Sequence, residues 1–142
     1  FCGVGGGLTN GVRSASMAAY VEHQGAYGVV CNSKIGVETI HAIKDAVEIP
    51  VVYTVISEKT DIQPYLTAGG DIINVSGAAR TPEIVGALRQ RYPELPIIAT
   101  GGPTEESILA TIRAGANAIT YTPPSSASLF ARTMADNRSE LE

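Results

Sequence analysis

The chain has 142 residues and a mass of 14.8 kDa, enough for one domain with a packed core. Hydrophobic residues make up 44% and charged residues 17%, so we expect an ordered chain. No apolar run reaches the roughly 18 residues of a membrane span. The net charge of −4, with 10 scattered Lys and Arg residues, argues against nucleic-acid binding. Two cysteines, each in an apolar run, indicate neither a disulfide framework nor a metal site. Composition therefore predicts a cytoplasmic protein without metal or cofactor.

Short apolar runs rich in Val and Ile alternate with helical stretches. The alternation predicts parallel βαβ units, because continuous apolar strands are covered on both faces. Two helix starts are marked by hydroxyl residues, Thr81 before Pro82 and Thr104 before Glu105. The predicted strands are 1–4, 27–31, 50–56, 71–75, 96–99 and 117–121, and the predicted helices are 14–24, 36–47, 61–68, 81–92, 105–114 and 126–137.

A repeat of 46 residues sharpens this prediction. Residues 49–54 (IPVVYT) recur as 95–100 (LPIIAT), and residues 68–73 (AGGDII) recur as 114–119 (AGANAI). The repeating unit has two strands and two helices, and three units fill the chain, whereas a (β/α)8 barrel needs four, or roughly 180 residues at this spacing. We therefore expect an α/β fold of TIM-barrel type with about six βα units and the N-terminal quarter missing. The alternative is a doubly wound parallel sheet. Residues 1–140 form a single predicted domain, and residues 141–142 are interpreted as the remnant of a tag.

Polar residues lie in register near the predicted strand ends. Aligning the repeats places Asn32, Asn74 and Thr120 at one level, with Thr54 and Thr100 level with them on the strands between. Two residues further on come Lys34, Ser76 and Thr122. Since the carboxyl ends of parallel strands form the usual ligand face, we predict that Asn32, Asn74, Ser76 and Thr100 bind substrate. The alternative is that these residues only end strands and cap turns.

The loop after the fifth strand has the features of an anion site. It contains Gly101 and Gly102, and Glu105 opens the next helix. Glycines let amide groups approach an anion, and a helix N-terminus adds partial positive charge. The sixth strand is followed by hydroxyl residues and another helix start. We therefore predict a phosphate site, although a simple Gly-Gly turn is the alternative; its residues are Gly101, Gly102, Tyr121, Thr122, Ser125 and Ser126.

Two side chains are candidates for catalysis. Lys34 follows a strand on the same face as Asn32, where a lysine can act as a Schiff-base nucleophile or pair with phosphate. Glu58 has the parity of Thr54 and is a candidate general base. A solvent-facing loop lysine is the alternative for Lys34.

Residues 96–104 (PIIATGGPT) and 112–119 (IRAGANAI) resemble the last two strands of phosphate-binding TIM barrels of the ribulose-phosphate-binding and class I aldolase type. The likeness is specific over residues 95–125 and architectural elsewhere. It implies a phosphate held by the Gly101-Gly102 loop and residues 121–126. The Schiff-base lysine of those aldolases, on the sixth barrel strand, has no counterpart, because the sequence contains no lysine after Lys59.

These observations predict an enzyme acting on a small phosphorylated metabolite, of the lyase (aldolase) or isomerase type. Two alternatives remain open. One is a non-catalytic barrel that senses a phosphate ligand or serves an assembly. The other is a hydrolase, although no Gly-x-Ser-x-Gly motif supports it. The unpaired strand edges of an incomplete barrel also leave a homo-oligomer open.

Overall fold

The computed structural model describes residues 1–5, 11–121 and 125–141. Strands and helices alternate along the chain, as the apolar pattern predicts. The strands are β1 (Cys2–Gly5), β2 (Val29–Cys31), β3 (Val51–Val55), β4 (Ile72–Val75), β5 (Ile97–Thr100) and β6 (Ala118–Thr120). The helices are α1 (Gly11–His23), α2 (Val37–Ala46), α3 (Gln63–Thr67), α4 (Thr81–Arg91), α5 (Glu105–Arg113) and α6 (Ser126–Leu141), with a 3-10 turn η1 (Ala78–Arg80) before α4.

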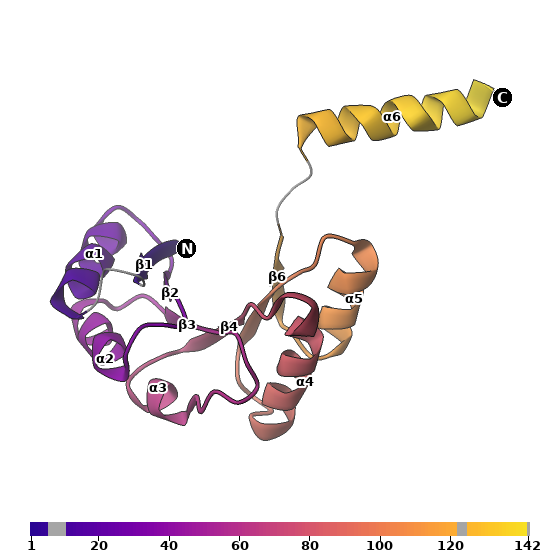
Figure 1. Ribbon diagram of the computed structural model, residues 1–142. Coiled ribbons are helices and arrows are strands. Elements are labelled where there is room, and N and C mark those ends of the chain that lie inside the picture. Colours follow the sequence, from indigo (N-terminus) through magenta and orange to yellow (C-terminus); the bar gives the residue numbers. More distant parts are fainter. Residues whose placement is uncertain (6–10, 122–124, 142) are drawn as a thin grey trace.

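The six strands form one parallel sheet in the order β1-β2-β3-β4-β5-β6. Each strand therefore lies beside its predecessor, and the order never reverses. A doubly wound sheet changes direction at a switch point and carries helices on both faces, so that alternative was wrong. The sheet curves, and α1 to α5 lie around its convex side (Figure 1). This is the arrangement of six consecutive βα units of a TIM barrel.

Alternate strand residues build the core between the sheet and the helices. Val51, Tyr53 and Val55 of β3 belong to the same buried cluster as helix residues such as Ile40 and Ile84. The opposite strand face, which includes Thr54, lines the concave side. The described residues include no helix long and apolar enough to cross a membrane.

The strand register corrects one expectation from the repeat. Thr54 lies opposite Asn74, as expected. Asn74, however, pairs with Ile98, whereas Thr100 pairs with Thr120. Thr100 and Thr120 therefore lie two residues further toward the carboxyl end of the sheet than Asn74. A sequence repeat identifies equivalent strands but not the stagger that a closed barrel requires between them.

Candidate functional site

The β5–α5 loop, residues 100–104, lies at the carboxyl rim of the sheet. Thr104 is the N-cap of α5: its hydroxyl accepts the Ser107 N–H at 3.2 Å, and the Ser107 hydroxyl accepts the Thr104 N–H at 3.2 Å. Gly101 packs closely on the core, since a Cβ there would lie 2.7 Å from Ile119 Cγ2 and 3.0 Å from Ile108 Cγ1. The capping box and this close packing fix the path of the loop.

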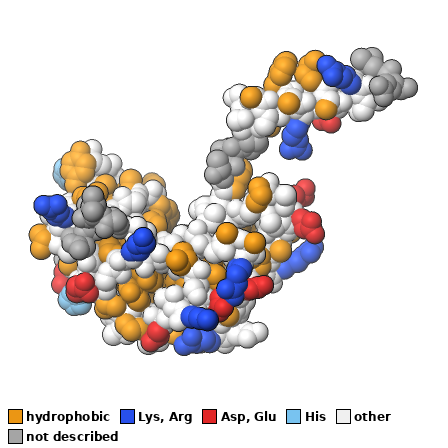
Figure 2. Space-filling model, viewed as in Figure 1, with side chains coloured by type: hydrophobic (Ala, Val, Ile, Leu, Met, Phe, Trp, Pro, Cys, Tyr) orange, Lys and Arg blue, Asp and Glu red, His pale blue; other side chains and the backbone are white. Residues whose placement is uncertain are grey.

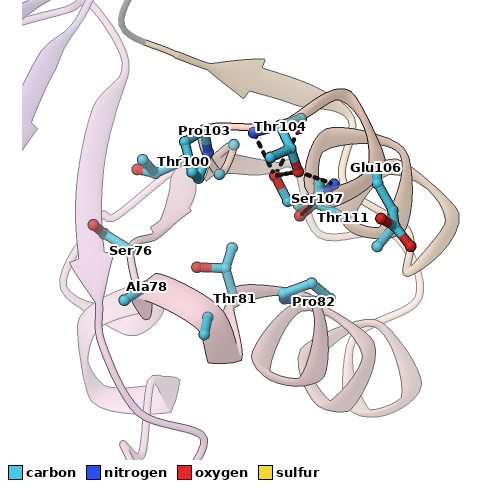
Figure 3. Close-up of a pocket in the computed structure, with 14 residues that line it drawn as sticks. Ser76, Ala78, Thr81, Pro82, Thr100, Pro103, Thr104, Glu106, Ser107 and Thr111 are labelled. Atoms are coloured by element: carbon cyan, nitrogen blue, oxygen red, sulfur yellow. Dashed lines mark hydrogen bonds between the residues drawn. The ribbon is translucent and has the colours of Figure 1, made fainter.

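A pocket of about 720 Å³ lies between the N-terminal ends of α4 and α5, on one side of this loop (Figure 3). We call it the α4–α5 pocket. Six of its lining residues carry hydroxyl groups, and the other described ones are small or apolar apart from Glu106. The hydroxyl residues are Ser76, Thr81, Thr100, Thr104, Ser107 and Thr111, and the others are Ala78, Ala79, Pro82, Gly101, Gly102, Pro103, Glu106 and Ala110.

Thr81 and Thr111 are the buried hydroxyl residues of the α4–α5 pocket, at 2% and 1% exposed. The Thr81 hydroxyl oxygen accepts the Gly77 N–H at 3.0 Å, which leaves its own proton for another acceptor. The Thr111 hydroxyl instead donates to the Ser107 carbonyl oxygen at 2.9 Å. Beside Thr81, Ala78 has a φ of +52°, a left-handed conformation that costs a non-glycine residue about 1 kcal/mol or more. Such strained backbone is often found where a chain lines a ligand site.

A second pocket, of about 470 Å³, lies on the other side of the same loop. We call it the α5–α6 pocket. The loop, α5, the end of β6 and α6 all contribute to it, and its lining includes Tyr121 and Arg132. Its lining residues are Gly101, Gly102, Pro103, Thr104, Glu105, Ile108, Tyr121 and Arg132. The residues that line both pockets are therefore Gly101, Gly102, Pro103 and Thr104.

The two pockets differ in charge. No Lys, Arg or His is among the described residues that line the α4–α5 pocket, and Glu106 is its one carboxylate. The α5–α6 pocket contains Arg132 and Glu105. Any anion on the α4–α5 side must therefore be bound by hydroxyl and amide donors alone, whereas the α5–α6 side also offers a cation.

The predicted binding residues are divided between these places. Ser76 and Thr100 line the α4–α5 pocket and Tyr121 the α5–α6 pocket, while Gly101 and Gly102 line both. Asn74 donates to the Thr54 hydroxyl at 3.2 Å, and the exposed Asn32 accepts the Lys34 N–H at 3.1 Å. Ser125 and Ser126 are exposed at the start of α6, and Thr122 lies outside the described residues. Among the described lining residues of either pocket we find none of Asn32, Asn74, Ser125 and Ser126.

Neither predicted catalytic residue is among the described residues that line the two pockets. Lys34 is exposed after β2. Glu58 follows β3, and its Oε1 accepts a hydrogen bond from Arg80 Nη2, while its Oε2 is buried without a described partner. The Arg80 guanidinium lowers the pKa of the Glu58 carboxyl and keeps it ionised. Nothing in this geometry tests the catalytic roles, which remain predictions.

Sequence reasoning missed several lining residues. Thr81 was expected to cap α4, but it is the first helical residue after η1, and its hydroxyl accepts from Gly77 instead. Arg132 lies within α6, where the pattern gave no reason to connect it with the glycine loop. Their approach depends on the tertiary arrangement of separate βα units. Within the parts of the chain that are described, no group of three or more His, Cys, Asp or Glu residues could hold a metal ion.

Comparisons with known proteins agree on the fold. No family model and no curated protein matches the chain. A protein of Burkholderia cenocepacia J2315 named as a phosphonomutase has a TM-score of 0.66 at 18% identity, over 99% of this chain and 68% of its own length. The native KDPGal structure has a TM-score of 0.63 at 19% identity, over 84% of this chain and 54% of that one. A mandelate oxidase variant with 2-hydroxy-phenylacetamide has a TM-score of 0.61 at 17% identity, over 78% and 45%.

These likenesses show the fold: the chain has the α/β architecture of a TIM barrel. It spans 45 to 68% of the length of the three structures. At 17 to 19% identity, the likeness supports the barrel topology alone.

Proposed function

We propose that the chain belongs to an enzyme of the lyase or isomerase type that acts on a small phosphorylated metabolite, with the phosphoryl group bound by the β5–α5 loop. The observation that carries the proposal is the position of this loop. It lies at the carboxyl rim of a TIM-barrel sheet, where the active sites of such barrels lie, and it separates two pockets of small-molecule size.

The chemistry of the loop suits an oxyanion. No described residue accepts a hydrogen bond from the Gly102 N–H, and the N-terminal turn of α5 follows directly, with its partial positive charge. Thr100 adds a hydroxyl group at the start of the same loop, whereas the Thr104 hydroxyl donates to the Ser107 hydroxyl oxygen at 3.1 Å. These neutral donors match the multiple acceptor oxygens of a phosphoryl group.

The reaction type is a separate part of the proposal. Lys34 and Glu58 are the proposed catalytic groups, and an isomerase would agree with the phosphonomutase name of one structural neighbour. The ion pair of Glu58 with Arg80 favours a second candidate, because a carboxylate whose pKa is lowered is a weaker base. In that candidate, the barrel senses a phosphorylated ligand without turning it over.

The first experiment is thermal unfolding with and without millimolar inorganic phosphate, sulfate and a panel of sugar phosphates. A ligand that binds only the folded state raises Tm by mass action. Gly101→Asp is a poor test variant, because a Cβ at Gly101 would clash with Ile119 and could disturb the fold as well as the site. Pro103→Glu is better, since Pro103 is exposed and lines both pockets.

We expect phosphate and at least one sugar phosphate to raise Tm of the wild type and not of Pro103→Glu, because the new carboxylate repels the anion. Pro93→Glu, the same substitution at an exposed proline between α4 and β5, should keep the full shift. No shift for any anion in the wild type would reject phosphate binding. With a ligand in hand, turnover of its candidate reactions by wild type and Lys34→Ala separates catalysis from sensing.

A further inference from the structure

We propose that Arg132 of α6 binds the phosphoryl group in the α5–α6 pocket, so that α6 is part of the ligand site. This inference rests on the proposed function and adds the side on which the phosphate lies and the residue that neutralises its charge. Helix α6 follows β6, the last strand of the described sheet.

Charge is distributed unevenly around the β5–α5 loop. Of the described residues that line the two pockets, Arg132 is the only Lys or Arg. A phosphate monoester carries nearly two negative charges at neutral pH. Neutral donors alone must compete with water for that charge, whereas a charge-assisted hydrogen bond is about twice as strong as a neutral one. The α5–α6 side therefore favours the phosphoryl group.

Arg132 is available to a ligand. Two other basic residues in the described part of the chain have carboxylate partners: Arg80 pairs with Glu58 and Glu83, and Lys44 pairs with Asp71. Arg132 has no ion pair with any described residue, and its side chain is exposed. A guanidinium in this state can direct its planar fork of N–H groups at phosphate oxygens.

The α5–α6 pocket also contains a charge opposite in sign to that of Arg132. Glu105 lines the α5–α6 pocket with Arg132. Glu105 is the first residue of α5, where the helix dipole stabilises its carboxylate. The same carboxylate repels an anion bound beside it. The two side chains therefore have opposite effects on phosphate affinity, and each gives a prediction of definite sign.

The loop and Tyr121 provide further hydrogen-bond donors for the phosphoryl group. Gly102, whose N–H has no described acceptor, lines the pocket from the loop, Tyr121 from the end of β6, and Arg132 from α6. A phosphoryl group with three terminal oxygens can accept from several of these donors at once. The non-phosphate part of the ligand would extend across the loop toward Ser76 and Thr100 in the α4–α5 pocket.

The test is titration of the full chain with inorganic phosphate at two ionic strengths, with binding measured by calorimetry or by the change in Tm. Arg132→Ala should raise the Kd for phosphate about tenfold and weaken its dependence on salt, because one charge-assisted contact is lost. Arg132→Lys should recover part of the affinity, since it keeps the charge and loses the planar fork. Glu105→Gln should lower the Kd.

Arg138→Ala is the matched control. Arg138 lies on the same helix and is exposed, but it is not among the described lining residues of the α5–α6 pocket. Its Kd should equal that of the wild type. All three side chains are exposed, so without ligand the variants should unfold at nearly the same Tm as the wild type.

The outcomes separate this inference from the function on which it rests. If Arg132→Ala binds phosphate as tightly as the wild type, while Pro103→Glu does not bind it, the loop site stands and the role of Arg132 is rejected. Equal losses in Arg132→Ala and Arg138→Ala would mean attraction by net charge alone and would also reject it. If the wild type itself does not bind phosphate, both proposals fail.

Discussion

Asp71 and Asn117 occupy equivalent positions in the 46-residue repeat and perform the same structural task at the amino end of the sheet. Asp71 Oδ2 accepts the Val51 N–H at 2.9 Å and a hydrogen bond from Lys44 Nζ at 2.7 Å. Asn117 Oδ1 accepts the Ile97 N–H at 2.9 Å and a hydrogen bond from Arg89 Nη2 at 2.7 Å. Each side chain thus ties its own strand to the preceding one. These equivalent residues of the repeat therefore stabilise the amino end of the sheet, opposite the ligand face.

We expect Asp71→Ala to lower the free energy of unfolding by about 1 to 3 kcal/mol, because the buried Val51 loses an acceptor for its N–H. Asp71→Asn should cost less, since Asn117 shows that an amide oxygen serves in this position and the partly exposed pair with Lys44 contributes at most about 1 kcal/mol. Urea unfolding measures both. Asp45→Ala, which removes an exposed carboxylate of α2, is the control. Equal losses in the two Asp71 variants would contradict this account.

At the scale of elements, the ion pair between Glu58 and Arg80 joins the end of β3 to η1, the turn that forms one wall of the α4–α5 pocket. The pKa of the Glu58 carboxyl is lower in the folded chain, first through its hydrogen bond from Arg80. A lowered folded pKa adds stability that is present above the ordinary pKa of glutamate and disappears as the pH falls through the folded value.

Glu58→Gln should therefore lower Tm at pH 7, and the difference from the wild type should disappear as the pH falls through the lowered pKa of the wild-type carboxyl. Scanning calorimetry across this range measures the difference. Glu83→Gln removes the second, more exposed partner of Arg80 and should have the smaller effect. A difference that is constant with pH would show that the amide disturbs packing rather than the ion pair.

Much of the element pattern could be predicted because each βα unit is encoded locally. Apolar runs fix the strands, and glycines such as Gly69 and Gly115, with φ of +115° and +112°, end the intervening helices where the repeat placed them. The start of α1 at Gly11 and the turn η1 were not predicted. Neither segment has the periodic spacing of apolar residues from which a helix is predicted.

The candidate site was predicted less completely, for a physical reason. Ser76, Thr100 and the glycine loop were found because a parallel sheet gathers its strand ends at one rim. Thr81 and Arg132 were missed because their approach to the loop depends on how separate units pack and how strands are staggered. A single sequence contains no direct record of those long-range contacts.

At the scale of the whole molecule, α6 stands apart from the five preceding helices (Figure 1). All of its side chains from residue 126 to residue 140 are exposed, including the apolar Leu129, Phe130 and Met134, and apolar groups are visible along it in Figure 2. A helix of 16 residues without tertiary packing is only marginally stable in water. The sheet differs, since every residue of β3 is buried.

Amide hydrogen exchange should therefore divide the ligand-free protein into two classes. We expect residues 126–141 to exchange within seconds and β3 to remain protected, because exchange there requires opening of the core. If Arg132 binds phosphate, addition of phosphate should slow exchange in α6 in wild type and not in Arg132→Ala. Protection of α6 without ligand would contradict the first expectation and would show that Leu129, Phe130 and Met134 pack on another surface. A dilution series would then identify that surface: protection lost on dilution places it on a second copy of the chain, and protection independent of concentration places it on the same barrel.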